Sequence, residues 1–211
     1  MVEFSDYFRE LVDDKRRASS DDLLSALIAA EEQGDRLSLD DVIANAVLLL
    51  FAGHETTVNL IGNGVYSLLR HPDQLAMLRQ HPDWIKGAVE ELMRFESPIQ
   101  TTTRQLAEDV TWGSQTMREG EIVLLVLGAA NRDPEQFRDP DRLDITRADN
   151  RHLAFGAGIH FCVGAPLSRL EAQIVIPMLL RRMPNLQLAD GPPEWRRLES
   201  WRGLTKLALT F

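Results

Sequence analysis

A single cysteine lies in a glycine-rich segment that favours an ionised thiol. Residues 155–164 read Phe-Gly-Ala-Gly-Ile-His-Phe-Cys-Val-Gly, and a segment with helical periodicity follows them. Gly156 and Gly158 permit a tight turn with positive φ before Cys162, and Gly164 allows backbone or a ligand to approach closely. A helix that begins just after Cys162 points its positive end and free N–H groups toward the sulfur. This setting stabilises the thiolate, the form of cysteine that binds metals.

Two other interpretations of Cys162 explain less of this pattern. Most single cysteines are small buried apolar residues, but that does not account for three glycines, an aromatic residue and a histidine at fixed offsets. A structural zinc ion needs four ligands. His160 and Cys162 could supply two, and the chain has neither a second cysteine nor a close pair of histidines.

A second polar motif interrupts an apolar helix. Residues 52–57 read Ala-Gly-His-Glu-Thr-Thr and follow the apolar run Val-Leu-Leu-Leu-Phe. Thr56 can donate a hydrogen bond to the carbonyl of Ala52, which bends a helix, and Gly53 removes a side chain there. Ala52, Glu55, Thr56 and Asn59 share one face by helical spacing. We therefore expect a groove with a polar wall; a polar stretch facing solvent is the alternative, and the flanking apolar residues argue against it.

A third pair, Glu91 and Arg94, lies three positions apart on a predicted helix, so its members face each other. Such pairs are common on solvated helix faces, and this pair carries little information by itself.

The elements that must position these residues form a mainly helical chain with a small β part. Helices are predicted over residues 3–18, from the caps at 19–22 to Glu32 with a stop at Gly34, over 39–70, from Pro72, from Pro82 to Phe95, and over 166–182. The run at 47–53 is apolar all round and predicts a buried central helix. Short strands are predicted within residues 101–131 and after 184, with a loop-rich segment at 128–160.

Composition sets wider limits. The chain has 211 residues, of which 44% are hydrophobic and 26% are charged. These values are typical of globular proteins. A net charge of −9 argues against a nucleic-acid binder and against docking on an anionic membrane. One cysteine cannot form an internal disulfide, so a cytoplasmic location is expected. The longest nearly apolar run, 43–53, is too short to span a bilayer.

The three motifs together resemble the cytochrome P450 family of haem-thiolate monooxygenases. Phe155, Gly158, Cys162 and Gly164 fill the family signature Phe-x-x-Gly-x-x-x-Cys-x-Gly, and the other two motifs precede it in the expected order. The resemblance is to soluble bacterial members. It implies a mainly α fold with a small β part, the C-terminal haem-binding half of the P450 fold.

The resemblance also implies roles for individual residues. Cys162 would be the axial thiolate ligand of the iron of haem b (heme b), and Glu55 and Thr56 the acid–alcohol pair on the oxygen side, where many bacterial members have aspartate for Glu55. The other implied cofactor contacts are Ala52, Gly53, Arg104, Phe155, Gly156, His160 and Gly164, with Arg104 and His160 on the haem propionates. Glu91, Arg94 and Arg142 would form a structural buttress for the cysteine loop.

The implied activity is oxidation of a small organic substrate with dioxygen and two electrons from a ferredoxin-type donor. Arg169 could meet such an acidic partner. Two alternatives remain: a truncated module that binds haem without turnover, and a structural remnant that binds none.

The resemblance spans residues 1–211 but only about half of the family fold, from the central helix region to the C-terminus. We expect apolar surface that an absent N-terminal half would cover, because such patches drive association. The isolated chain is therefore expected to form homo-oligomers or to pair with a separate N-terminal half.

Overall fold

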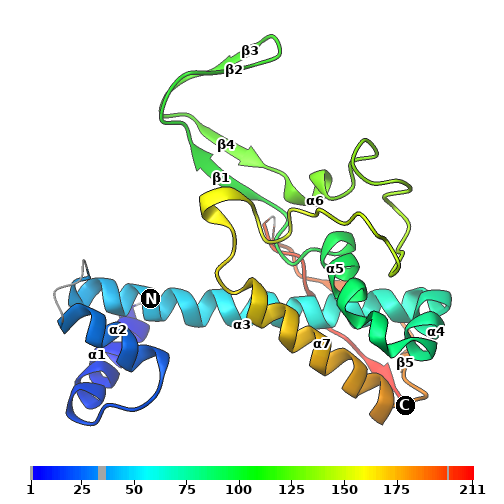
Figure 1. Ribbon diagram of the computed structural model, residues 1–211, viewed down its shortest axis with the longest axis horizontal. Coiled ribbons are helices and arrows are strands. Elements are labelled where there is room, and N and C mark those ends of the chain that lie inside the picture. The colour runs from blue at the N-terminus through cyan, green and yellow to red at the C-terminus, as the bar shows by residue number, and fades with distance from the viewer. Residues whose placement is uncertain (1, 33–36, 199) are drawn as a thin grey trace. The chain divides into compact units, whose positions relative to one another are not determined.

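The computed structural model describes residues 2–32, 37–198 and 200–211. These residues are mainly helical, with four separate two-stranded antiparallel sheets (Figure 1). The chain divides into two compact units, residues 1–55 and 56–211. The predicted fold class, mainly α with a small β part, is confirmed.

The first unit contains α1 (Val2–Arg17), α2 (Leu23–Glu32) and the first half of α3 (Leu39–Arg70). The predicted caps are present. Asp22 Oδ1 accepts the N–H of Ser25 at 2.8 Å, and Ser38 and Asp41 each accept the other's backbone N–H, at 3.2 and 2.9 Å. The core of this unit consists of Phe8, Val12, Ile28, Val42, Ile43 and Ala46. The predicted stop at Gly34 lies outside the described residues.

The second unit is built from the rest of α3 and the helices that follow it. Proline begins two of them as predicted: α4 (Pro72–Gln80) and a single 3-10 turn (Pro82–Trp84) that leads into α5 (Ile85–Phe95). The last helix, α7 (Ala165–Arg182), packs against α5. The core of this unit includes Leu60, Val65, Leu68, Val89, Leu92, Leu143, Ala172 and Ile176.

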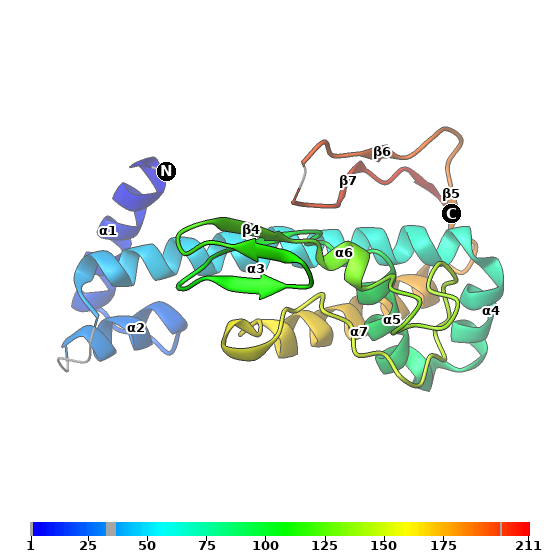
Figure 2. The ribbon, with the colours of Figure 1, turned by 90° about the horizontal axis from the view of Figure 1, so that it is seen from above.

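The strands form hairpin-like pairs beside these helices. β1 (Thr102–Gln105) pairs with β4 (Ile122–Leu125), and β2 (Val110–Trp112) pairs with β3 (Gln115–Met117). At the C-terminus β5 (Gln187–Leu188) pairs with β8 (Leu209–Thr210), and β6 (Glu194–Trp195) pairs with β7 (Leu204–Lys206). Figure 2 shows the β6–β7 pair on one side of the second half of α3 and helices α5 and α7 on the other.

One segment that was predicted to hold strands also contains a helical turn. Short strands separated by turns were expected within residues 101–131, but β4 ends at Leu125 and a helical turn, α6 (Leu127–Ala130), follows. Apolar and small residues suit both a strand and a helical turn, so the sequence pattern did not distinguish the two.

The predicted bounds of α3 are right, but its middle is not buried on all sides. Leu48, Phe51 and Val58 are 59%, 58% and 50% exposed. The apolar run thus faces solvent on one side, because no described part of the chain covers it. Among the described residues, no helix combines the length and apolar character needed to cross a membrane.

Candidate functional site

The cysteine loop contains the tight turn that its glycines predicted. Gly156 and Gly158 have φ values of +71° and +63°. Both values lie in the region that favours glycine. A 3-10 turn spans Gly158–His160, and the N–H of Cys162 donates to the carbonyl of Phe155 at 2.9 Å. The loop therefore folds back on itself and holds the exposed cysteine at its outer end.

Gly164 joins this loop directly to α7. The N–H of Ala165 donates to the carbonyl of Cys162 at 3.2 Å, so the helix begins within three residues of the sulfur. A Cβ on Gly164 would lie 3.8 Å from Cys162 Sγ. Glycine here leaves the flank of the sulfur open, which is what a ligand approaching the thiolate needs.

Large apolar side chains surround the thiol and face solvent. Ile159 is 98% exposed, and Phe161, Val163, Leu167 and Leu170 are each at least half exposed. Contiguous exposed apolar residues mark a binding surface more often than a free surface. The loop thus combines an exposed thiol with an uncovered apolar face.

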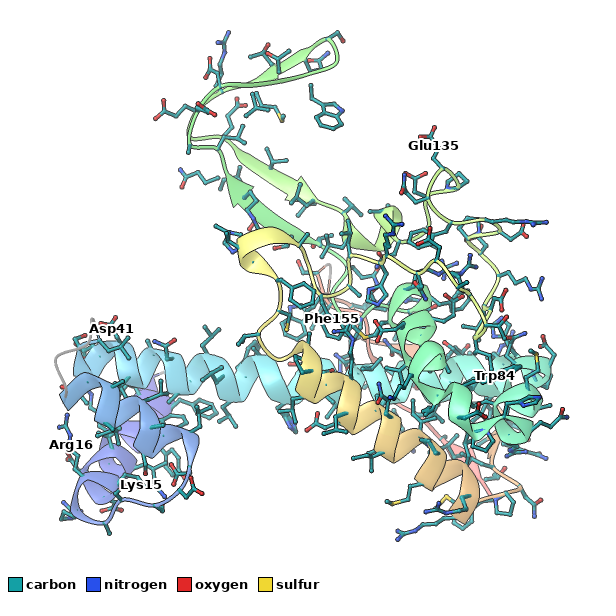
Figure 3. All side chains as sticks on the ribbon, in the orientation of Figure 1. Lys15, Arg16, Asp41, Trp84, Glu135 and Phe155 are labelled. Carbon is teal, nitrogen blue, oxygen red and sulfur yellow. The ribbon has the colours of Figure 1, made fainter. Side chains whose placement is uncertain are left out.

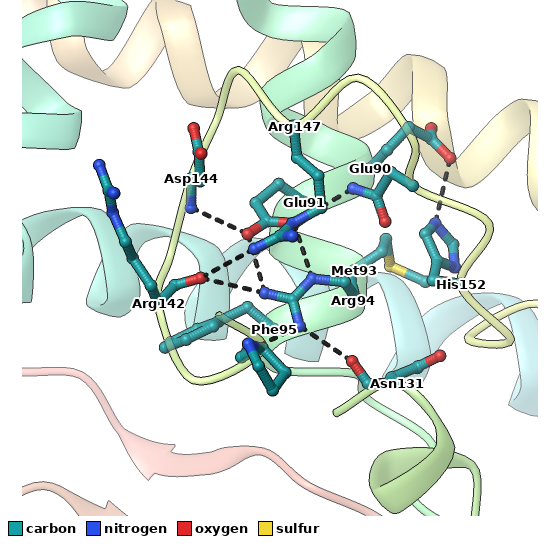
Figure 4. A network of polar contacts seen from close by, with 12 residues as sticks. Glu90, Glu91, Met93, Arg94, Phe95, Asn131, Arg142, Asp144, Arg147 and His152 are labelled. Atoms are coloured by element: carbon teal, nitrogen blue, oxygen red, sulfur yellow. Dashed lines mark hydrogen bonds and ion pairs between the residues drawn. The ribbon is translucent and has the colours of Figure 1, made fainter. Parts of the chain in front are cut away.

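Helix α5 carries a buried ion pair. Glu91 and Arg94 on α5 are fully buried, and the carboxylate accepts two hydrogen bonds from the guanidinium, at 2.8 and 2.9 Å (Figure 4). Arg94 also donates to the carbonyls of Asn131, Pro140 and Arg142 at 2.8–3.1 Å. A planar guanidinium can make all of these bonds at once, whereas an ammonium could not.

The third arginine of this network is not the side chain that the sequence suggested. Arg142 contributes only its backbone carbonyl, and its own side chain is exposed. Arg147 takes the expected place, because its Nε donates to Glu91 at 3.1 Å. The amide of Asn150 and the backbone N–H of Asp144 complete the shell around Glu91, at 3.2 and 2.8 Å.

Asn131 connects this network to the cysteine loop and was missed in the sequence. Its Oδ1 accepts the N–H of Leu153 at 2.7 Å, its Nδ2 donates to Ser97 at 2.8 Å, and its carbonyl accepts from Arg94. It is fully buried. A buried asparagine whose polar groups are all hydrogen-bonded holds two segments at a fixed distance. In the sequence, only the Asn-Arg-Asp-Pro turn indicated a role for this residue.

A second polar cluster joins α5, α7 and the segment before Phe155. Glu90 accepts two hydrogen bonds from Arg169, at 2.7 and 2.8 Å, and one from His152 Nε2 at 3.1 Å. His152 Nδ1 accepts the N–H of Ala154 at 3.2 Å, which assigns the ring hydrogen to Nε2. Arg169, expected as a contact for an acidic partner, is thus paired within the chain.

The ionisation of Glu90 reflects this cluster. Partial burial favours the protonated acid, but hydrogen bonds from His152 and Arg169 and the arginine charge outweigh it and lower the pKa of Glu90 to about 2. Glu90 in turn raises the pKa of Arg169, chiefly through the hydrogen bonds between the two side chains.

The polar motif of α3 lies at the boundary of the two units, with Glu55 in the first and Thr56 in the second. Both side chains are partly buried. The hydroxyl of the next residue, Thr57, donates to Ser168 on α7 at 3.3 Å. This bond ties α3 to the first turn of the helix that follows Cys162.

The remaining predicted groove residues differ in their surroundings. Ala52 and Gly53 are exposed, and a Cβ on Gly53 would meet nothing within 4 Å. Asn59 is buried against Gly203, and its Nδ2 has no hydrogen-bond partner among the described residues. The space beside Gly53 is open, whereas Asn59 belongs to the core.

The two predicted propionate ligands are available for an anion. Arg104 on β1 donates to Thr102 Oγ1 and to the carbonyl of Thr103, at 3.2 and 2.7 Å, and pairs with no carboxylate among the described residues. His160 is exposed at the end of the 3-10 turn, and its ring forms no polar contact within the described part of the chain.

A model of the cytochrome P450 family matches residues 2–88 and 83–206. This chain belongs to the cytochrome P450 family. It is 56% identical to cytochrome P450 107B1 of Saccharopolyspora erythraea over 98% of its length, and 50% identical to the biotin biosynthesis cytochrome P450 of Bacillus subtilis over 97%. It spans about half of each, 52%.

Solved P450 structures share this fold. P450BioI in complex with an acyl carrier protein ligated to hexadec-9Z-enoic acid superposes with a TM-score of 0.94 at 50% identity, over all of this chain and 53% of that one. The tirandamycin C-bound P450 monooxygenase TamI gives 0.94 at 44% identity, over 99% and 53%. Family membership implies haem with iron and a cysteine thiolate ligand, and monooxygenase relatives.

The residues present fit a haem. Cys162 is the only cysteine of the sequence, and its thiol is exposed among apolar side chains that could cover a porphyrin face. Gly164 leaves room beside Sγ. A cysteine sulfur is the donor type that P450 iron requires, and the side chains of Arg104 and His160 offer N–H donors for two propionates.

Proposed function

We propose that this chain is the haem-binding half of a haem-thiolate monooxygenase that holds haem b through Cys162. The observation that carries this proposal is the loop geometry. An exposed thiol stands at the end of a glycine turn, directly before a helix, in a chain of the cytochrome P450 family. When bound, the haem supplies the iron at which dioxygen is reduced with two electrons and one oxygen atom enters an organic substrate.

On the thiolate side, the chain's own residues hold the sulfur and limit its hydrogen bonds. The N–H of Cys162 is already used by the carbonyl of Phe155. N–H groups near the sulfur tune how much electron density a thiolate gives to a metal. The buried network of Glu91, Arg94 and Asn131 keeps the start of the loop fixed, so that the sulfur is presented in one position.

On the opposite side, Glu55 and Thr56 would handle protons. Thr56 would hold dioxygen and a water by its hydroxyl, and Glu55 would pass protons from solvent. The open space beside Gly53 supports this assignment, because a diatomic molecule needs room next to the helix. A carboxylic acid in hydrogen-bond reach of a reacting oxygen acts as a general acid.

Two polar side chains would anchor the cofactor. Arg104 and His160 would each bind a propionate, since both lack a carboxylate partner among the described residues. We propose a small organic substrate and a ferredoxin-type electron donor, as expected for soluble bacterial relatives. The names of the relatives, which include biotin and polyketide biosynthesis, do not agree on one substrate class.

A second candidate is a haem-binding module without turnover. It is favoured by the exposed side chains of Leu48, Phe51 and Val58 on α3, which leave that face of the helix open to water. A distal pocket open to water would bind haem and still fail to keep water away from the reaction.

One experiment distinguishes these candidates. The chain is mixed with haem, reduced under carbon monoxide and examined by absorption spectroscopy. The proposal predicts haem uptake and the red-shifted Soret band of an intact thiolate ligand. A thiolate spectrum without substrate oxidation in the presence of an electron donor indicates the module. Absence of haem uptake would refute both candidates and indicate a structural remnant.

A further inference from the structure

The cluster of Glu90, His152 and Arg169 lies outside the Glu91–Arg94 network and reaches the cysteine loop by a different route. Each member comes from a different segment: Glu90 from α5, Arg169 from α7, and His152 from the loop before Phe155. Arg169 donates two side-chain hydrogen bonds to one carboxylate, in a fork that fixes the plane of its guanidinium.

That plane also faces an aromatic ring. The guanidinium carbon of Arg169 lies 4.5 Å from the centre of the Phe155 ring. This separation is a cation–π distance. The ring of His152 lies 5.9 Å from the same ring. Phe155, labelled in Figure 3, is therefore held by two members of one hydrogen-bonded cluster. Its side chain is buried.

Phe155 is the residue whose carbonyl accepts the N–H of Cys162, at 2.9 Å. The path from Glu90 to the sulfur-bearing residue thus consists of three contacts: a bidentate ion pair, a cation–π contact and one backbone hydrogen bond. All three contacts are made by groups of this chain.

We propose that Arg169 is a positioning residue for Cys162, which it acts on through the ring of Phe155, with Glu90 and His152 fixing the guanidinium. This inference rests on the proposed role of Cys162 as a metal ligand. Arg169 does not touch a substrate or the reacting atoms. Its function is to keep the Phe155 carbonyl aligned, so that the backbone at Cys162 has one conformation and the sulfur one direction.

Lysine should not replace arginine in this role. It could keep the charge near Glu90, but an ammonium has neither a planar face for Phe155 nor a bidentate fork for the carboxylate. If Arg169 acted by its charge alone, Arg169→Lys would behave like the unaltered chain. If Arg169 positions Cys162, it would not.

The test measures amide hydrogen exchange in the full chain, which needs no cofactor. In Arg169→Ala the amide of Cys162 should exchange on the order of tenfold faster, because a charge-assisted bond and a cation–π contact are lost. The amide of Val65, which is buried inside α3, should change little. Arg169→Lys should resemble Arg169→Ala, and it decides the question if the alanine variant does not fold. Arg182→Ala, exposed on the same helix, is the matched control and should leave both amides unchanged.

Equal acceleration at Cys162 and Val65 would assign Arg169 a general structural role and overturn the proposal, as would no change at either amide. A second readout is haem titration, where Arg169→Ala should bind roughly 10- to 100-fold more weakly. If the unaltered chain took up no haem, the proposed function would fail, while the exchange data would still decide whether Arg169 positions Cys162.

Discussion

Glu91 and Arg94 show why a residue pair with little weight in a sequence can govern a site. Their spacing is shared by many exposed pairs, yet both side chains are fully buried, and all of their polar side-chain atoms are bonded. The pair itself was identified from the family motif. Its partners Arg147 and Asn131 were not, because contacts between residues 56 and 37 positions apart leave no local pattern.

Breaking this pair should be costly. Glu91→Gln or Arg94→Leu leaves a buried charge without its partner, and we expect the free energy of unfolding to fall by roughly 3–5 kcal/mol. Chemical denaturation measures it. Arg118→Leu, which breaks an exposed pair with Asp109, should cost less than about 1 kcal/mol. Equal effects at the two pairs would contradict the account of the network.

Glu90 should make stability depend on pH. Its pKa is lowered from 4.5 to about 2, so its contribution is present above pH 4.5 and is lost as the pH falls toward 2. Because the carboxylate is only partly buried, solvent screening reduces the effect, and Glu90→Gln should lower the unfolding free energy near pH 6 by about 1–2 kcal/mol. Denaturation at several pH values should show that the difference in unfolding free energy between Glu90→Gln and the unaltered chain becomes smaller below pH 4.5.

The matched control is Glu108→Gln, at an exposed site, which should show no such difference. A difference for Glu90→Gln that stayed constant down to pH 2 would contradict the assignment.

At the scale of elements, local chemistry determined most of what the sequence could predict. Pro72 and Pro82 begin helical segments, and Leu39–Arg70 forms one helix, because caps, prolines and periodicity act within a few residues. The end of β4 and the turn of α6 escaped prediction, since apolar and small residues suit both states.

Replacing glycine by alanine should lower the stability of the chain at some positions and raise it at another. In Gly156→Ala, φ is +71° and the new Cβ would lie 3.3 Å from the carbonyl of His160. This variant should destabilise the chain by roughly 1–2 kcal/mol. Gly158→Ala should cost less, since its Cβ meets nothing within 4 Å. Gly62→Ala, inside α3 with open space around it, should stabilise by about 0.5–1 kcal/mol. Thermal unfolding orders the three variants, and a stabilising Gly156→Ala would contradict the loop geometry.

At the scale of the whole molecule, exposure could not be read from periodicity. The run before Ala52 is apolar on every side, which predicts burial, but Leu48, Leu50 and Phe51 face solvent in this chain. A hydrophobic pattern indicates which face of a helix is suited to burial. That face is buried only where other segments pack against it. The glycine turn of the cysteine loop was predicted because its contacts lie within ten residues.

The uncovered apolar surface should drive association. Large apolar side chains on α3 and α7 are each at least half accessible: Leu48, Phe51, Val58, Leu167, Leu170 and Ile174. We expect sedimentation to show oligomers whose fraction rises with protein concentration. Leu167→Ser and Leu170→Ser together should reduce it. A monomer at all concentrations would contradict this expectation.

The central claim is that Cys162 is the thiolate ligand of a haem iron, and the most direct measurement is the Soret band of the reduced, carbon monoxide-treated chain after haem reconstitution. The unaltered chain should show the red-shifted thiolate band. Cys162→Ala should lose it completely, while Ser168→Ala, in the first turn of the same helix, should keep it. A red-shifted band that persists in Cys162→Ala would contradict the account.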